Sequence, residues 1–235
     1  MRPVPYITTQ HMIAVDKLMM EYYEIELLQM MENAGFNLAL LAKKHFNLRE
    51  GDNVLVLAGT GGNAGGALVA ARRLANWGMD ISVILGSSLK LIRPITLHQI
   101  DILKKMNVPF IDNFNGRHFH LIIDGLIGYN LQGKPEGKFI EIINRANEIP
   151  SPILSLDIPS GMDSTTGEIY DPCINADVTM TLALPKTGFL NQKSKEYFGE
   201  LYLADIGVPP ELFQRMRIME AAFPIFDEKT ILKMS

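Results

Sequence analysis

Cysteine is almost missing from this sequence of 235 residues, in which Cys173 stands alone. A single thiol excludes an internal disulfide and a zinc site built on thiolates, and it fits a reducing compartment. An excess of basic charge is also lacking. The formal net charge is -4 and the sequence pI is about 5.8, so no electrostatic footprint for nucleic acid is present. A nucleic-acid partner is therefore not expected.

Long apolar runs are absent as well. No stretch approaches the ~18 consecutive apolar residues of a membrane span, so no membrane partner is expected. The first residues, MRPVPYITTQHM, lack the apolar segment of a secretory signal peptide. These features together predict a cytoplasmic protein. The length and ordinary composition favour a single α/β domain over residues 1–235, with a C-terminal tail at 221–235.

A glycine-rich turn is the main feature that is present. Residues 53–72 read NVLVLAGTGGNAGGALVAAR. The apolar run at 54–58 predicts a strand buried on both faces, and apolar residues at helical spacing from Leu68 predict a helix. Five glycines lie between them at 59–66, where a backbone without Cβ lets an anion such as phosphate approach the N–H groups of a helix start. The alternative is a tight turn that needs glycine for its geometry alone.

Two common nucleotide-binding patterns can be compared with this turn. A P-loop ends in Lys followed by Ser or Thr, whereas Gly66 is followed by Ala-Leu, which excludes an ATPase or kinase loop of that kind. The span from Gly59 to Ala64 fits G-x-G-x-x-A, the dinucleotide fingerprint. That fingerprint requires an acid at the end of the next strand, but the strand predicted at 81–85 is followed by Gly-Ser-Ser. Binding of NAD in the manner of dehydrogenases is therefore disfavoured.

Strands and helices alternate along the chain. Two helices come first, one capped by Thr8 or Thr9 and running to about Tyr22, the other beginning at Glu24. Further strands are predicted at 81–85, 108–111, 121–123, 153–156, 178–184 and 199–203, and further helices at 95–106 and 136–149. This alternation predicts an α/β fold with a mostly parallel, doubly wound sheet.

Polar side chains follow the carboxyl ends of several predicted strands, which form the rim where open α/β sheets bind ligands. They are Asn63, Asp124, Asp157, Ser160 and Lys186. A carboxylate that follows buried aliphatic residues needs a donor or a cation, so a hard cation or a proton-transfer role would suit Asp124 and Asp157. The alternative is that each carboxylate only caps its turn. Ser160 lies in I-P-S-G rather than G-x-S-x-G, which argues against an acyl-transfer nucleophile.

A series of segments resembles the YjeF N-terminal domain family, whose enzymes are NAD(P)H-hydrate epimerases. In the family's order the segments are Asp16, MENAG at 31–35, the glycine turn with LVAAR after it, DGLIGYNLQGK at 124–134, LDIPSGMD at 156–163, LPKTG at 184–188 and DIGVP at 205–209. The resemblance implies a Rossmann-like, three-layer α/β/α sandwich. It also implies an isomerase of nicotinamide nucleotide repair, which interconverts the R and S hydrates of NADH and NADPH at C6.

The resemblance further implies where the site lies. A potassium ion would be held by Asn63, Asp124 and Ser160, and Asp124 or Asp157 would handle protons as the ring hydrate opens or exchanges. The substrate, NADHX or NADPHX, would be contacted by Gly62, Asn63, Ala64, Gly65, Gly66, Gly128, Tyr129, Asn130, Leu131, Gln132, Gly133, Lys134, Asp157 and Lys186. A homodimer is expected, and the dehydratase of the same pathway would be a separate chain.

The glycine turn departs from the family pattern. Family enzymes typically carry GNNGGDG, where this chain reads GGNAGGA at 61–67. The missing Asp at Gly66 removes an acceptor for hydroxyl or amide donors of the dinucleotide, and an unpaired polar group costs ~1–3 kcal/mol. A second function therefore stays open, that of a YjeF-type domain without catalysis that serves as a nucleotide-binding or dimerising module.

Overall fold

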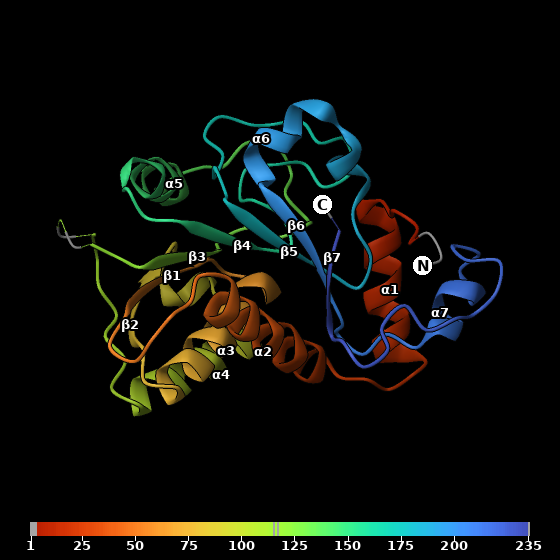
Figure 1. Cartoon of the computed structure of the whole chain (residues 1–235), viewed down its shortest axis with the longest axis horizontal. Helices are drawn as coiled ribbons and strands as arrows, with labels where there is room; N and C mark the ends of the chain where they lie inside the picture. Colours follow the sequence, from red (N-terminus) through yellow and green to blue (C-terminus); the bar gives the residue numbers. More distant parts are fainter. Residues whose placement is uncertain (1–3, 115, 117, 235) are drawn as a thin grey trace.

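A seven-stranded sheet forms the middle of the molecule (Figure 1). The computed structural model describes residues 4–114, 116 and 118–234. The strand order is β2-β1-β3-β4-β5-β6-β7, and all neighbours are parallel except β7, which runs antiparallel to β6. The strands are β1 Asn53–Ala58, β2 Asp80–Leu85, β3 Leu121–Gly125, β4 Ile153–Leu156, β5 Val178–Leu182, β6 Glu200–Ala204 and β7 Ile231–Lys233. The predicted mostly parallel α/β sheet is confirmed.

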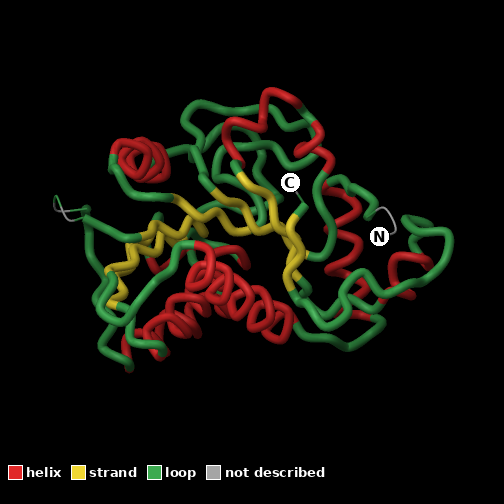
Figure 2. Tube along the Cα trace, in the orientation of Figure 1, coloured by secondary structure: helices red, strands yellow, loops and turns green. Residues whose placement is uncertain are grey.

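Helices cover both faces of the sheet (Figure 2). One face carries α2 (Leu27–His45), α3 (Gly62–Asn76) and α4 (Pro94–Lys105), and the other carries α5 (Lys138–Glu148) and α6 (Lys195–Phe198). α1 (Thr9–Glu21) and α7 (Pro210–Arg215) stand together beside the end of the sheet that carries β7. Short 3-10 turns are η1 Leu89–Leu91, η2 Thr187–Leu190 and η3 Gln192–Ser194. This is the three-layer α/β/α sandwich that the sequence predicted.

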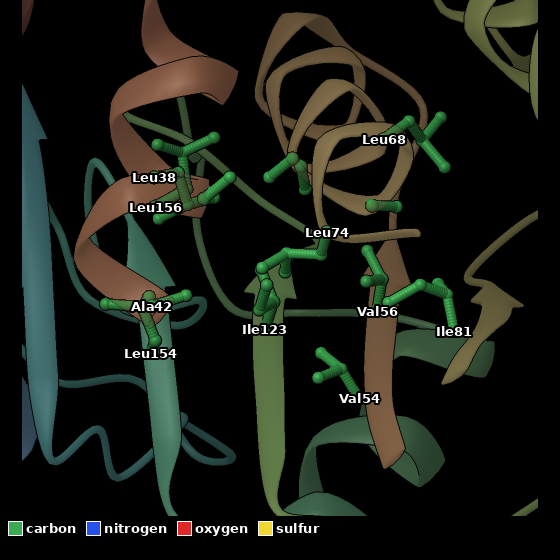
Figure 3. Packing of buried hydrophobic residues seen from close by; sticks show 14 of the residues in the cluster. Leu38, Ala42, Val54, Val56, Leu68, Leu74, Ile81, Ile123, Leu154 and Leu156 are labelled. Atoms are coloured by element: carbon green, nitrogen blue, oxygen red, sulfur yellow. The ribbon is translucent and has the colours of Figure 1, made fainter. Parts of the chain in front are cut away.

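The core between the sheet and α2–α3 is built from branched aliphatic side chains. In Figure 3, Leu38 of α2 and Leu74 of α3 belong to the same cluster as Val56, Ile123 and Leu156 of the strands, and all five are fully buried. Burying one such side chain contributes ~1.5–3 kcal/mol. Because β1 is covered on both faces, its residues form the continuous apolar run seen in the sequence.

α2 and α3 pack closely because a glycine removes a side chain from their contact. A Cβ on Gly35 of α2 would lie 2.5 Å from the carbonyl oxygen of Gly66 in α3 and 2.4 Å from Val69 Cβ. One turn earlier, Glu32 accepts two hydrogen bonds from Arg72 Nη2, at 2.5 and 2.6 Å. These contacts hold α3 against α2 at two places along its length, near Gly66 and at Arg72.

Two secondary-structure expectations differ from the structure. Residues 108–111 form no continuous strand, because Pro109 has no N–H to donate and Phe110 makes an isolated parallel bridge to Val83. The segment 221–235, expected as a tail, contributes β7 to the sheet. The predicted domain also spans residues 1–3, 115, 117 and 235, which lie outside the described part. Within the described part, no helix is both long and apolar enough to cross a membrane.

Candidate active site

A cavity of about 700 Å³ opens at the carboxyl ends of β1, β3 and β4. Its walls come from α1 and α2, the first turn of α3, the loop after β3, and the end of β4. The volume is typical of pockets that bind cofactor-sized ligands, and open α/β sheets bind ligands at this edge. Much of the wall from α1 and α2 is apolar, with Met12, Met20, Met30 and Met31, although Asp16 and Lys17 of α1 also line the cavity. Arg93 and Lys134 add positive charge to the lining.

The glycine turn forms one wall of this cavity. A Cβ on Gly59 would lie 1.8 Å from the carbonyl oxygen of Leu126, so glycine lets the end of β1 touch the loop after β3. Thr96 of α4 supports the turn by donating from Oγ1 to the carbonyl oxygen of Gly61 at 2.9 Å. The first turn of α3, beginning at Gly62, lines the cavity. The N-terminus of this 15-residue helix presents unpaired N–H groups that favour an anion.

Asn63 is the polar side chain of that first turn. Its Nδ2 is buried and has no hydrogen-bond partner in the described part of the chain. The amide packs against Gly128, where a Cβ would lie 3.2 Å from Asn63 Cγ, so any larger residue at 128 would crowd it. Asn63 also lines the cavity. A buried polar atom without a partner usually marks a place for water, an ion or a ligand.

Asp124, at the end of β3, is fully buried behind the cavity wall. Its Oδ1 accepts from Ser160 Oγ at 2.6 Å and from Leu126 N at 3.1 Å, and its Oδ2 accepts from Ser155 Oγ at 2.8 Å and from Ser160 N at 2.9 Å. Burial raises the pKa of Asp124, and these hydrogen bonds oppose that rise. Neither Asp124 nor Ser160 is among the residues that line the cavity.

Asp157 follows β4 and does line the cavity. Its φ of 65° is left-handed, a conformation that Asp tolerates better than most residues. Oδ1 accepts from Lys186 Nζ, from Leu182 N at 3.1 Å and from Thr181 Oγ1 at 3.2 Å. Lys186 is fully buried, and its ammonium group also donates to Leu182 O at 2.9 Å and to Thr181 Oγ1 at 3.2 Å. Lys186 therefore holds the carboxylate of Asp157 from behind the wall.

Asp16 and Tyr129 form a second polar pair in the wall. Tyr129 lies in the loop after β3, and its Oη donates to Asp16 Oδ2 of α1 at 2.5 Å. Burial raises the pKa of Asp16, against the hydrogen bond from Tyr129 and the charge of Lys186, while the charge of Asp157 adds to the rise. Burial and the charge of Asp16 together raise the pKa of Tyr129, so this hydroxyl stays a neutral donor.

The sequence profile of a family described as "YjeF-related protein N-terminus" matches residues 27–188. The chain belongs to this family. Among similar YjeF-related proteins, an "NAD(P)H-hydrate epimerase" of Dehalogenimonas lykanthroporepellens is 40% identical over 89% of this chain and 84% of its own. An "NAD(P)H-hydrate epimerase" of Entamoeba histolytica is 29% identical over 98% of this chain and 99% of its own.

A bifunctional YjeF-related relative and a solved structure extend the comparison. The "Bifunctional NAD(P)H-hydrate repair enzyme Nnr" of Moorella thermoacetica is 30% identical over 88% of this chain, but the match spans 41% of that larger protein. The crystal structure of the yeast protein ynu0 superposes with a TM-score of 0.83 at 25% identity, covering 97% of this chain and 99% of the yeast chain. The predicted family and its mostly parallel α/β fold are confirmed.

The structure of this YjeF-related chain brings most of the expected site residues to one cavity. The lining includes Gly62, Asn63, Gly66, Gly128, Tyr129, Asn130, Leu131, Gln132, Lys134 and Asp157. The expected substrate contacts that do not line it are Ala64, Gly65, Gly133 and Lys186. Ala64 is fully buried, and the space beside Gly65 is occupied by Met31, whose Cε lies 2.3 Å from where a Cβ would stand.

Asp16 and Arg93 are lining residues that the residue-level interpretation missed. A signal for Asp16 was present in the sequence. It shares a helix face with Met12, Val15 and Met19, all of them buried, so it is an acid at an apolar position of an amphipathic helix. Arg93 precedes Pro94 at the start of α4 and gives no comparable signal, because a loop arginine is usually solvated.

Proposed function

We propose that this chain is an NAD(P)H-hydrate epimerase, an isomerase that interconverts the R and S hydrates of NADH and NADPH at C6. The observation that carries the proposal is a cofactor-sized cavity bounded by the α3 N-terminus, the loop after β3 and Asp157. The names of relatives matched over nearly their whole length support the same activity. The alternative of a module without catalysis has less support, because Asn63, Asp157 and the α3 N-terminus remain in the cavity despite the altered glycine turn.

The dinucleotide backbone is assigned to the positively charged part of the cavity. Its pyrophosphate would lie at the first turn of α3, where helix N–H groups favour an anion, and Arg93 and Lys134 would neutralise the charge. The loop at 128–134 would complete the substrate contacts. Gly62 leaves this approach open, since no atom lies within 4 Å of where its Cβ would be.

The residues also suit a monovalent cation, which we assign to potassium. Asn63, Asp124 and Ser160 can each offer a side-chain oxygen, and together they carry one negative charge, which suits a hard monovalent cation. Ser160 Oγ lies 2.6 Å from Asp124 Oδ1 and 3.3 Å from the carbonyl oxygen of Ile127, so its proton has two acceptors. Turning that proton to Ile127 would leave one acceptor position of Asp124 Oδ1 open to the ion, while the other three hydrogen bonds to this carboxylate remain. When bound, the ion would supply positive charge that stabilises the substrate's anionic groups.

Asp157 is assigned the proton-transfer role, because Asp157 lines the cavity and Lys186 fixes the orientation of its carboxylate. Asp124, the other candidate, is separated from the substrate by the wall and is assigned to the cation and to the position of the loop after β3. The carboxylate of Asp157 would accept a proton as the hydrate exchanges at C6, a task suited to a positioned general base.

The proposed reaction implies a second enzyme activity that uses its product. A dehydratase must act on one epimer, and the larger size of the bifunctional relative suggests that this activity lies outside the present 235 residues. A cytoplasmic location, expected from the features of the sequence, and a homodimer, implied by the family resemblance, are further proposals. Light scattering during size-exclusion chromatography of the purified protein would give the mass of two chains for a dimer and of one chain for a monomer.

The activity can be tested with purified epimers. R-NADHX and R-NADPHX would be incubated separately with the protein in potassium buffer, and chiral chromatography would follow the appearance of the S form. Conversion well above the spontaneous rate is expected for at least one hydrate, and faster conversion in potassium than in choline buffer would support the cation. Conversion at the spontaneous rate for both hydrates would refute the proposed function.

A further inference from the structure

Asp16 and Asp157 line the same cavity in unlike surroundings. Asp157 accepts three hydrogen bonds on one oxygen, one of them from the buried ammonium group of Lys186, which is the environment of a carboxylate anion. Asp16 has one neutral donor, the hydroxyl of Tyr129, and it lies on the apolar face of α1. Burial and the charge of Asp157 raise the pKa of Asp16. Two acids in such different environments suit the roles of proton donor and proton acceptor.

We propose that Asp16 is a second catalytic residue, which exchanges a proton with the C6 hydroxyl group of the hydrate while Asp157 acts as its acid–base counterpart. The inference rests on the proposed epimerase function and adds a residue to it. Tyr129 is a positioning residue, because it acts on the reaction through its hydrogen bond to Asp16.

The proton transfer can be written so that atoms and electrons balance. The carboxyl proton of Asp16 moves to the C6 hydroxyl oxygen, the C6–O bond breaks, and its electron pair leaves with water. The lone pair of the ring nitrogen N1 forms the second bond of a C6–N1 iminium. Water then attacks the opposite face of C6, the N1 pair returns to nitrogen, and the proton of that water passes to Asp157. The product is the other epimer, and the reverse reaction exchanges the roles of the two acids.

The position of Asp16 is fixed by contacts on both sides of the pair. Ser164 Oγ donates to the carbonyl oxygen of Tyr129 at 2.8 Å and lies 2.5 Å from Thr9 Oγ1 at the start of α1. Thr9 N also donates to Thr165 Oγ1 at 2.9 Å. One serine therefore ties both α1 and the Tyr129 loop to the segment after β4, so the pair needs little rearrangement before proton transfer.

The experiment compares the steady-state kinetics of Asp16→Asn with those of the wild type. Asparagine keeps an acceptor for Tyr129 but has no proton to give, so kcat should fall by ~100-fold or more while KM stays within about threefold. The alkaline decline of the kcat profile, caused in the wild type by ionisation of Asp16, should also vanish. Asp101→Asn is the matched control, since it makes the same chemical change at an exposed position of α4 that does not line the cavity.

Tyr129→Phe gives an independent readout if Asp16→Asn does not fold. The hydrogen bond from Tyr129 lowers the pKa of Asp16, so its removal should move the alkaline decline of kcat to higher pH. An unmoved decline, or an Asp16→Asn enzyme with kcat within about threefold of the wild type, would overturn the role of Asp16. In both cases an active wild type would leave the epimerase function standing. An inactive wild type would refute the function itself.

Discussion

Replacing Lys186 by methionine should destabilise the fold by about 3–5 kcal/mol, because the change leaves the buried carboxylate of Asp157 without its cation. Lys186 is 0% exposed and Asp157 is 2% exposed, so water has little access to replace the lost partner. Methionine retains most of the aliphatic stem, and the loss therefore reports on charge rather than on a cavity. Urea unfolding with linear extrapolation gives the free energy of unfolding, and the m-value checks that the transition is unchanged.

The matched control removes the second charge as well. In the double variant, Lys186→Met with Asp157→Asn, no charge of this pair remains, and asparagine tolerates the positive φ of residue 157. The double variant should lose less free energy of unfolding than the two single variants lose together, and the difference should be at least about 1 kcal/mol. A Lys186→Met protein as stable as the wild type, or losses that simply add, would refute the reasoning that this buried pair holds Asp157.

Three further outcomes are expected. Gly59→Ala should lower the free energy of unfolding by about 3 kcal/mol, because the new Cβ would lie 1.8 Å from the Leu126 carbonyl oxygen. In the same calorimetric scan Gly62→Ala should be nearly neutral, because no atom lies within 4 Å of its new Cβ, and equal losses for the two variants would contradict this reasoning. Because the pKa of Asp16 is raised in the folded state, its stabilising contribution is present below pH 3.8 and is lost as the pH rises through the folded pKa. The free energy of unfolding of Asp16→Asn should therefore rise relative to that of the wild type over this range. A difference between the two proteins that does not change with pH would contradict the raised pKa. Asn63→Ala should weaken activation by potassium relative to choline, and an unaltered potassium response would exclude Asn63 as a ligand.

Much of the fold could be predicted from the sequence because the sheet is parallel and buried. Strands covered on both faces need continuous apolar runs, so β1 and β4 could be recognised directly, and β4 matches its predicted bounds at 153–156. The strand predicted at 108–111 was wrong for a local reason, since one proline and a position at the edge of the sheet prevent a continuous ladder of hydrogen bonds to β2. β7 could not be predicted, because three residues at an edge carry no periodicity.

The position of the cavity was predictable, but the depth of each candidate side chain was not. Parallel strands direct their carboxyl ends to one edge, so Asn63, Asp124 and Asp157 could be placed together. The strand pattern does not say which of them faces the ligand. The structure separates Asp157, in the wall, from Asp124, behind it, through hydrogen bonds to Ser155 and Ser160 that join segments far apart in the chain.

The departure of the glycine turn from the family pattern also has a physical explanation. A Cβ on Gly66 would lie 2.9 Å from Leu156 Cδ2, so the leucine occupies the space that the family's acidic side chain would need. The change at residue 66 therefore removes a polar side chain where Leu156 packs against α3, while the α3 N-terminus and Asn63 remain in the cavity.

The most direct measurement is the rate at which R-NADHX equilibrates with its S epimer, observed by NMR at the C6 hydrogen, for the wild type and for Asp157→Asn in the same potassium buffer. Since Asp157 is the proposed base, the wild type should equilibrate the epimers rapidly and the variant should be slower by ~100-fold or more. Equal rates for the two proteins would contradict the assignment of the reaction to this cavity.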